Sequence, residues 1–392
     1  MPSPLRLVRL ITWLPIGGIE RRLVATLPRI DREIFAPEVI CLRERGPLAE
    51  DLERAGIPVH VLPLRSRLSP IGLWRLSRRL RGADIVHSHM YRSNVPGTVA
   101  ARLARVPVVV GHIHNVDTWE RHNQRRWDRL TARRRAATIA VSHGVQRNFC
   151  ETLGLDAALV PVIHNGIDLT PFETPMDRTA ARGELGLGEG TVALICAARL
   201  HRQKNHRGLL EAVASLPSDL PPWFLLLAGD GGERESLEQM VVQRGLGSRV
   251  RFLRSRDDVP RILRACDVAV LASEKEGFSN VVLESLAAGL PVVATDVGGN
   301  AEAIEEGESG SLVPRGDMRA LADRLARLIA DAELRRRMGE RARQRARAFS
   351  LEEMIRKTEC LYLETLRRRR PGRFDARLSE ALERRRAPTL TS

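Results

Sequence analysis

The sequence of 392 residues contains few aromatic residues and few cysteines, and it has no long apolar run. Aromatic residues make up only 4% of the chain and do not alternate with arginines as base-stacking surfaces do, which argues against nucleic-acid binding. The five cysteines form no C-x-x-C pair, so reduced thiols are favoured over disulfides or zinc. No segment has the length of a membrane span or the apolar region of a signal peptide, and the sequence therefore predicts a cytoplasmic protein.

Lysine is also scarce, although the chain is strongly basic. Only Lys204, Lys275 and Lys357 are lysines among 63 basic residues, and the formal net charge is +15. Compositional bias, attraction to an anionic lipid surface and nucleic-acid binding all remain open as explanations of the charge, and the last has the least support. Because arginine serves as the general cation in this chain, the retained Lys204 suggests that arginine is not an acceptable substitute at that position.

Short apolar runs alternate with helix-compatible segments along the chain. We expect strands at residues 5–14, 38–42, 58–64, 84–90, 106–114, 138–142 and 160–164, and again at 191–197, 223–228, 249–253, 268–272, 291–295 and 310–313. This alternation predicts an α/β fold with two parallel, doubly wound sheets, and the length suits two domains. In such sheets ligands lie beyond the carboxyl ends of the strands.

Residues 273–300 carry the most informative motif, in which Glu276 and Glu284 are separated by seven residues. The pattern predicts a loop followed by a helix that Ser279 or Asn280 caps and Gly289 ends. The free N–H groups of a helix N-terminus suit a phosphate or sugar hydroxyls. Two carboxylates can accept hydrogen bonds from two polyols, and the motif therefore suggests a nucleotide sugar.

Two further loops suit phosphate groups. Arg199 and Lys204 follow the predicted strand 191–197, where a planar guanidinium and a compact ammonium can converge on a diphosphate. Gly17 and Gly18 follow the first predicted strand, and their lack of a side chain lets backbone amides approach a ligand closely.

These motifs, in this order, resemble the retaining glycosyltransferases of family four, which have the GT-B fold. The resemblance also rests on Ala-Ala-Gly-Leu-Pro-Val-Val-Ala-Thr after Glu284 and on Asn165-Gly-Ile-Asp168. It implies two Rossmann-like doubly wound domains that face each other across a cleft, with a C-terminal helix crossing back to the first domain. We accordingly expect an acceptor domain at 1–168, a nucleotide-sugar domain at 169–350, the crossing helix at 351–366 and a basic tail at 367–392.

The resemblance also implies roles for individual residues. Catalytic roles fall on His114, Glu276, Arg199 and Lys204, with the two cations neutralising the departing diphosphate and Glu276 orienting the sugar. Glu284 would hold the ribose, and His89 and Asn115 would lie on the acceptor side. The expected donor-binding positions are Gly17, Gly18, Arg199, Lys204, Arg254, Glu276, Gly277, Phe278, Ser279, Asn280, Val281 and Glu284. One departure is Ala198, because the family usually has glycine before the arginine.

The implied reaction moves a sugar from a nucleoside-diphosphate sugar to an acceptor hydroxyl, in cell-surface glycan or glycolipid assembly. No metal and no cofactor are expected, and a UDP-sugar is the favoured donor, although uridine, guanosine and adenosine all remain open near Arg254. A transferase of the GT-A type is disfavoured because the sequence has no Asp-x-Asp motif. A nucleotide-sugar epimerase on the same fold and a non-catalytic basic binding protein remain as alternatives.

Two other features admit more than one interpretation. His87, His89, His112 and His114 are paired at a spacing of two, which places each pair on one face of a strand as core histidines or, less favoured, as metal ligands. The helix-compatible stretch from Trp119 to Arg135 is rich in arginine, with Trp119, Trp127 and Leu130 near one face. It is either a solvated helix with its aromatic residues packed inward or a helix that lies on an anionic membrane surface, at the inner face of the cell membrane.

Overall fold

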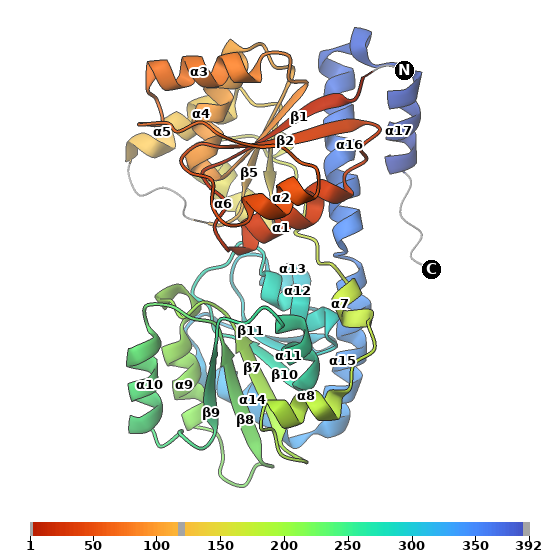
Figure 1. Ribbon diagram of the computed structural model, residues 1–392. Helices are drawn as coiled ribbons and strands as arrows, with labels where there is room; N and C mark the ends of the chain where they lie inside the picture. The colour runs from red at the N-terminus through yellow and green to blue at the C-terminus, as the bar shows by residue number, and fades with distance from the viewer. Residues whose placement is uncertain (1–2, 117–121, 387–392) are drawn as a thin grey trace. The chain divides into compact units, whose positions relative to one another are not determined.

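The computed structural model describes residues 3–116 and 122–386, which form two compact units (Figure 1). Unit 1 extends to Gly166 and resumes at Leu351, whereas unit 2 is the continuous segment Ile167–Ser350. Each unit holds a six-stranded parallel sheet with helices on both faces. The predicted fold class of two doubly wound domains is therefore confirmed.

The sheet of unit 1 has the strand order β3-β2-β1-β4-β5-β6. Its strands are β1 (Leu5–Ile11), β2 (Phe35–Cys41), β3 (Val59–Val61), β4 (Ile85–His89), β5 (Val108–Ile113) and β6 (Ala137–Ala140). One face is covered by α3 (Pro70–Leu80), α4 (Met90–Leu103) and α5 (His122–Ala132), with α6 (His143–Leu153) beside α5. The other face packs against α1 (Gly18–Thr26), α2 (Ala49–Arg54), α16 (Leu351–Arg369) and α17 (Ala376–Arg386). The last part of the chain thus belongs to the core of the first unit.

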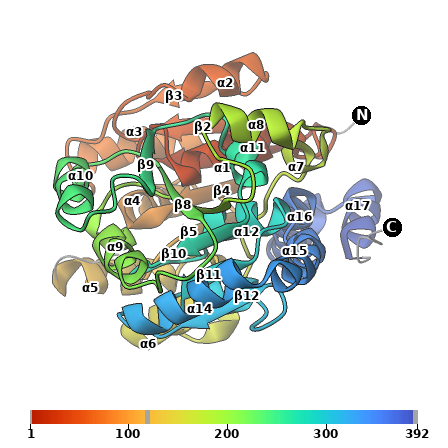
Figure 2. The same cartoon turned by 90° about the horizontal axis from the view of Figure 1, so that it is seen from below.

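Unit 2 has the corresponding order β12-β11-β10-β7-β8-β9. Its strands are β7 (Val192–Ala197), β8 (Trp223–Ala228), β9 (Val250–Arg254), β10 (Val268–Leu271), β11 (Val292–Thr295) and β12 (Gly310–Val313). In Figure 2 the helices α9 (His206–Ala214), α10 (Arg234–Gln243) and α14 (Met318–Ala330) lie on one side of this sheet. On the other side lie α8 (Arg178–Glu184), α11 (Val259–Ala265), α12 (Asn280–Ala287) and α15 (Ala332–Arg347), while α7 (Thr170–Glu173) and α13 (Asn300–Ala303) are short. Both faces of the sheet are covered, which explains why its strands are continuous apolar runs rather than alternating ones.

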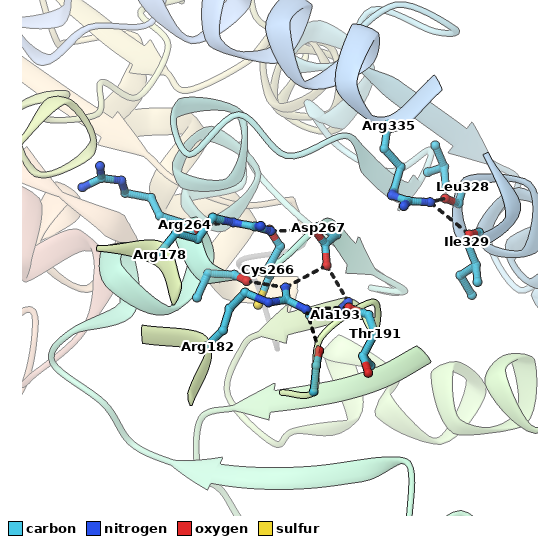
Figure 3. Close-up of polar contacts among 12 residues, drawn as sticks. Arg178, Arg182, Thr191, Ala193, Arg264, Cys266, Asp267, Leu328, Ile329 and Arg335 are labelled. Carbon is cyan, nitrogen blue, oxygen red and sulfur yellow. Dashed lines mark hydrogen bonds and ion pairs between the residues drawn. The ribbon is translucent and has the colours of Figure 1, made fainter. Parts of the chain in front are cut away.

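An arginine pair attaches α8 to the sheet of unit 2 (Figure 3). The carboxylate of Asp267, directly before β10, accepts a 2.7 Å hydrogen bond from the amide of Ala193 in β7. Arg178 and Arg182 on α8 each contact that carboxylate, at 2.6 and 3.1 Å. Arg182 also donates to the carbonyl of Thr191, so α8 is fixed to the start of β7, the first strand of unit 2.

The predicted strand at 160–164 is wrong. This segment contributes only an isolated bridge between Val162 and Ala140 at the end of β6. Pro161 has no amide hydrogen to donate, and it therefore interrupts the ladder that a further parallel strand would need.

The predicted basic tail at 367–392 is also wrong as far as residue 386, because this segment continues α16 and then forms α17. Leu378 and Leu382 are buried in the core of unit 1, and they lie on one face of α17. From the same helix Arg385 forms ion pairs with Glu359 of α16 and with Asp31. The arginine-rich composition concealed this apolar face. Within the described ranges no helix has both the length and the apolar character required to cross a membrane.

The Gly229–Gly232 turn after β8 packs directly against the loop after β7. A Cβ atom added at Gly231 would lie 2.3 Å from the carbonyl oxygen of Leu200, whereas one added at Gly232 would meet nothing within 4 Å. We predict that Gly231→Ala lowers the free energy of unfolding by about 1–3 kcal/mol, because backbone must move to make room. The matched variant Gly232→Ala should change it by less than about 1 kcal/mol, and equal effects in denaturant titrations of the two proteins would contradict this packing.

Candidate active site

Most predicted site residues of unit 2 follow β7 and β10, the two strands at the switch point of its sheet, whereas Arg254 ends β9 at the edge of the sheet. The chain winds outward from β7 through β8 and β9, then returns to add β10 on the opposite side of β7. The loops that follow β7 and β10 therefore lead away from each other. In parallel sheets ligands bind between two such loops, at the carboxyl ends of the strands. Lys204 follows β7 in a short 3₁₀ turn, Arg202–Lys204, and Glu276 follows β10.

Lys204 and Glu276 form the central ion pair of this site. The Nζ atom of Lys204 lies 2.5 Å from Oε1 of Glu276, and the hydroxyl of Ser273 donates to the same oxygen at 2.7 Å. Glu276 is buried, with 6% of its surface exposed, while the Lys204 side chain retains 22%. Both contacts use Oε1, so within the described part of the chain Oε2 remains available to a ligand.

Backbone contacts fix the two loops to each other and to the segment after β11. The amide of Glu274 donates to the carbonyl of Gln203 at 2.8 Å, and the Gln203 side chain donates to the carbonyl of Lys275 at 2.8 Å. Gly298 has a φ of +61°, and a Cβ atom there would lie 2.0 Å from the carbonyl oxygen of Glu276. Only glycine allows this approach, which holds Glu276 in place.

The loop Gly277–Ser279 leads into α12, as the motif predicts. Ser279 is the N-cap residue by its extended backbone, but its side chain makes no capping hydrogen bond. Glu284 is half-buried, one turn inside the helix. Phe278 is 4% exposed and its ring centroid lies 5.3 Å from that of Phe349, so its side chain anchors the loop. Gly277, Asn280 and Val281 lie on this same loop and first helical turn.

The two arginines predicted to bind the donor are both exposed. Neither the Arg199 nor the Arg254 guanidinium has a hydrogen bond or ion pair with any residue in the ranges that the structure describes. Arg254 has a positive φ of 59°, and its carbonyl accepts a 2.8 Å hydrogen bond from Gly229. Lys204 and Glu276 are thus paired before a ligand binds, whereas the guanidinium groups of Arg199 and Arg254 retain all their hydrogen-bond donors for a ligand.

Unit 1 places its predicted residues at the carboxyl ends of β1 and β4, the strands of the equivalent switch point, and of the neighbouring β5. Gly17 and Gly18 form the N-terminus of α1 after β1, with Gly17 as the N-cap. His89 ends β4, and His114 and Asn115 directly follow β5. The sequence therefore placed these residues at the correct edge of the sheet, and their roles remain predictions.

The four paired histidines form a stack across β4 and β5. Neighbouring rings lie 4.0 to 5.4 Å apart between centroids. His87 Nε2 lies 3.2 Å from His112 Nδ1, and His89 Nδ1 lies 3.1 Å from His114 Nε2. Burial lowers the pKa of all four imidazoles well below the usual value, and the nearby guanidinium of Arg9 lowers each pKa further. The stack is therefore neutral at pH 7.

The helix predicted at Trp119–Arg135 is present in part, as α5. Trp119 lies outside the described residues. Trp127 and Leu130 are 43% and 40% exposed, so the interpretation in which the aromatic residues pack inward is wrong for Trp127. The helix instead buries polar groups, including a fully buried ion pair between Asp128 and Arg135 at 2.7 Å.

Sequence reasoning missed the residues that hold Glu276 in place. Ser273 binds its carboxylate, and Thr295 at the end of β11 donates to the carbonyl of Ser273 at 2.6 Å. A glycine pair at Gly298 and Gly299 was the available signal, because paired glycines after a strand often mark a close backbone approach.

Two doubly wound units, each with polar groups at the carboxyl ends of the strands beside its switch point, define a nucleotide-binding α/β protein of the GT-B type. Comparison with known families assigns residues 177–345 to "Glycosyl transferases group 1" and residues 16–171 to "Glycosyltransferase Family 4". The chain belongs to this glycosyltransferase family.

Curated relatives agree with this assignment. The chain is 30% identical over 325 residues to D-inositol 3-phosphate glycosyltransferase of Nocardia farcinica, covering 78% of this chain and 71% of the relative. It is 29% identical to N-acetyl-alpha-D-glucosaminyl L-malate synthase of Bacillus anthracis (81% and 82% covered). It is 26% identical to UDP-Gal:alpha-D-GlcNAc-diphosphoundecaprenol alpha-1,3-galactosyltransferase of Escherichia coli (89% and 94% covered).

Among solved structures, Anabaena Alr3699/HepE in complex with UDP-glucose has a TM-score of 0.79 at 26% identity, covering 92% of this chain and 99% of that one. The same protein with UDP and glucose gives a TM-score of 0.80 at 27% identity, covering 90% and 98%. The predicted family and its glycosyltransferase activity are confirmed, and these comparisons give no support to the epimerase or the non-catalytic alternative.

The histidine stack predicts acid sensitivity. The folded protein keeps these imidazoles neutral, whereas the unfolded chain binds protons near pH 6.5. Below that pH the unfolded state holds more protons, so the free energy of unfolding should fall by about 1.4 kcal/mol per pH unit for each histidine that stays neutral. We expect His112→Asn to reduce this slope between pH 7 and 5 by about 1.4 kcal/mol per pH unit, because the unfolded variant binds one proton fewer. The exposed-histidine control His122→Gln should leave it unchanged, and a flat profile in wild type would refute the neutral stack.

Proposed function

We propose that the protein is a retaining, metal-independent hexosyltransferase that moves a sugar from a UDP-sugar to a hydroxyl of a glycan or lipid-linked acceptor. The observation that carries this proposal is the pairing of Lys204 with the buried carboxylate of Glu276 at the switch point of unit 2. An ammonium group held there can stabilise the charge of the departing diphosphate, and Oε2 of the glutamate can accept hydrogen bonds from the sugar.

The uridine nucleotide is proposed from the relatives. The Escherichia coli relative takes UDP-Gal by its name, and the Anabaena structures hold UDP, glucose or UDP-glucose. The acceptor class is likewise proposed from the diphosphoundecaprenol-linked substrate in the name of the Escherichia coli relative. We assign the ribose to Glu284, the sugar to Glu276 with His114, and the acceptor side to His89 and Asn115.

Cations of the chain support a mechanism without a metal. Arg199 is exposed without a partner among the described residues, and Lys204 lies near it on the same loop after β7. Two such groups can supply the positive charge that Mg²⁺ supplies to a leaving diphosphate in other transferases. Since the sequence offers no evident protein nucleophile, we propose attack from the face that the leaving phosphate vacates, which retains the configuration of the sugar.

We predict that Lys204→Ala and Glu276→Gln each lower kcat for sugar transfer at least about 100-fold, because each removes a charge that acts on the donor. Activity would be followed as UDP release from UDP-sugars in the presence of excess EDTA, which should not reduce the wild-type rate. Lys275→Ala is the matched control, since that lysine is exposed and adjacent to Glu276, and it should retain activity within about threefold. Wild-type turnover in either site variant, with the fold intact, would overturn the assignment.

We also propose that α5 lies on an anionic membrane surface. Trp127 and Leu130 are exposed on this helix, surrounded by the exposed arginines Arg125, Arg126 and Arg129. Exposed apolar side chains beside arginines suit the interface between lipid headgroups and acyl chains. Such an association would bring the enzyme to a lipid-linked acceptor.

The double substitution Trp127→Ala and Leu130→Ala should weaken binding to phosphatidylglycerol vesicles at least about tenfold, because each side chain contributes apolar burial in the interface. Vesicle flotation measures this effect, with phosphatidylcholine vesicles as the uncharged comparison. Trp74→Ala is the control, since Trp74 is another exposed tryptophan of unit 1, on α3. Equal flotation of the double variant and the control would contradict docking through α5.

A further inference from the structure

Unit 1 contains a small internal cavity, and two of the residues that line it, His89 and His114, are those proposed above for the acceptor and the sugar. It lies between α1, α16 and the carboxyl ends of β4 and β5, and its volume is about 30 Å³. Its lining residues are Arg9, Ile19, Arg22, Leu23, Thr26 and Ile30, the four stacked histidines, and Met354, Ile355 and Thr358. Arg9 and His87 are buried, whereas Ile19, Arg22, His114 and Met354 are half-buried and surround its outer part.

A buried positive charge lies against this cavity without a counter-charge. Arg9 is 6% exposed, and its guanidinium contacts the ring of His87 and the hydroxyl of Tyr362. It forms no ion pair with a carboxylate anywhere in residues 3–116 or 122–386. A buried charge is costly unless it is paired, so the position favours an anionic partner.

Three of the residues that line the cavity carry nitrogen atoms without hydrogen-bond partners. Nε of Arg9, Nε2 of His89 and Nε2 of His112 are buried and unsatisfied. His89 is 4% and His112 is 8% exposed, so solvent does not replace the missing partners. A neutral imidazole can place its N–H on either nitrogen, and each of these groups can therefore act as a hydrogen-bond donor. Unsatisfied buried polar atoms of this kind are rare in folded proteins.

We propose that this cavity is a binding site for a carboxylate group. A carboxylate would provide the counter-charge that Arg9 lacks, and its oxygens would accept hydrogen bonds from the histidine nitrogens. Its size also fits, because 30 Å³ corresponds to about two water-sized atoms.

A metal ion is the competing occupant, since ligand atoms of His87, His89 and His112 lie within 4.8 Å of one another. The lining disfavours it. Two guanidinium groups, those of Arg9 and Arg22, border the cavity, and among the residues that the structure describes no carboxylate or thiolate does so. A cation would therefore be repelled by the charges that attract an anion.

The test is saturable stabilisation of the intact protein by acetate, measured as the rise in melting temperature at constant ionic strength with chloride as the reference. Acetate should raise the melting temperature by a few °C in a concentration-dependent way, and isothermal titration should give the same affinity. Phosphate should stabilise less, because it exceeds the volume of the cavity.

Two substitutions locate the effect. Arg9→Met removes the charge at similar length and should abolish the response to acetate. His112→Leu removes one donor and should weaken the apparent affinity at least tenfold, which keeps the test decisive if the buried Arg9 variant fails to fold. The control His122→Gln, on exposed α5, should respond as wild type does.

Glycolate and acetate, which differ by one hydroxyl group, distinguish the source of the carboxylate. If both bind and labelled sugar is transferred to glycolate, the carboxylate belongs to the acceptor; if both bind without transfer, it belongs to a separate ligand. The proposal is overturned if no carboxylate stabilises wild type beyond chloride, or if Zn²⁺ or Co²⁺ stabilises it through His112 while acetate does not. Since binding is measured without turnover, failure here leaves the proposed transferase activity untouched.

Discussion

The ion pair between Lys204 and Glu276 is the interaction on which the candidate site depends. It joins the loop after β7 to the loop after β10. From these two adjacent strands the chain continues toward opposite edges of the sheet, and a parallel sheet binds its ligands at such a point. The pair is supported by the Ser273 hydroxyl and by the close approach of Gly298. Because the glutamate is buried and held through one oxygen, a cation and a hydrogen-bond acceptor are oriented before any ligand arrives, which is the condition for electrostatic catalysis.

The sequence allowed the edge of each sheet to be predicted, but not the contacts made there. Apolar runs and glycine turns located Lys204 and Glu276 after their strands, since parallel strands end at a common edge. Their mutual contact joins residues 72 positions apart, and no local periodicity encodes such a pairing. Phe278 shows the same limit, because its place in a ligand-binding motif concealed its packing on Phe349.

The abundance of arginine made burial hard to predict from the sequence, both for apolar residues and for charged ones. At the C-terminus it concealed the apolar face of α17, where Arg385 is itself paired with Glu359 and Asp31. On α5 the carboxylate of Asp128 is buried against Arg135, which follows the helix, while Trp127 is exposed, the reverse of the usual amphipathic pattern. A guanidinium group can satisfy several acceptors at once, and so it is tolerated in interiors where a composition rule would exclude it.

The discontinuity of unit 1 has a consequence for how the protein is made. Tyr362, Leu366 and Leu382 complete the core beneath β1 and β2, yet they are synthesised only after the whole of unit 2. Unit 2 is one uninterrupted segment, so its core is complete while that of unit 1 still lacks one layer of helices. The usual N-terminal-first order of domain folding during synthesis is therefore reversed here. The nascent first half must stay soluble with an uncovered apolar sheet face until α16 and α17 have been synthesised.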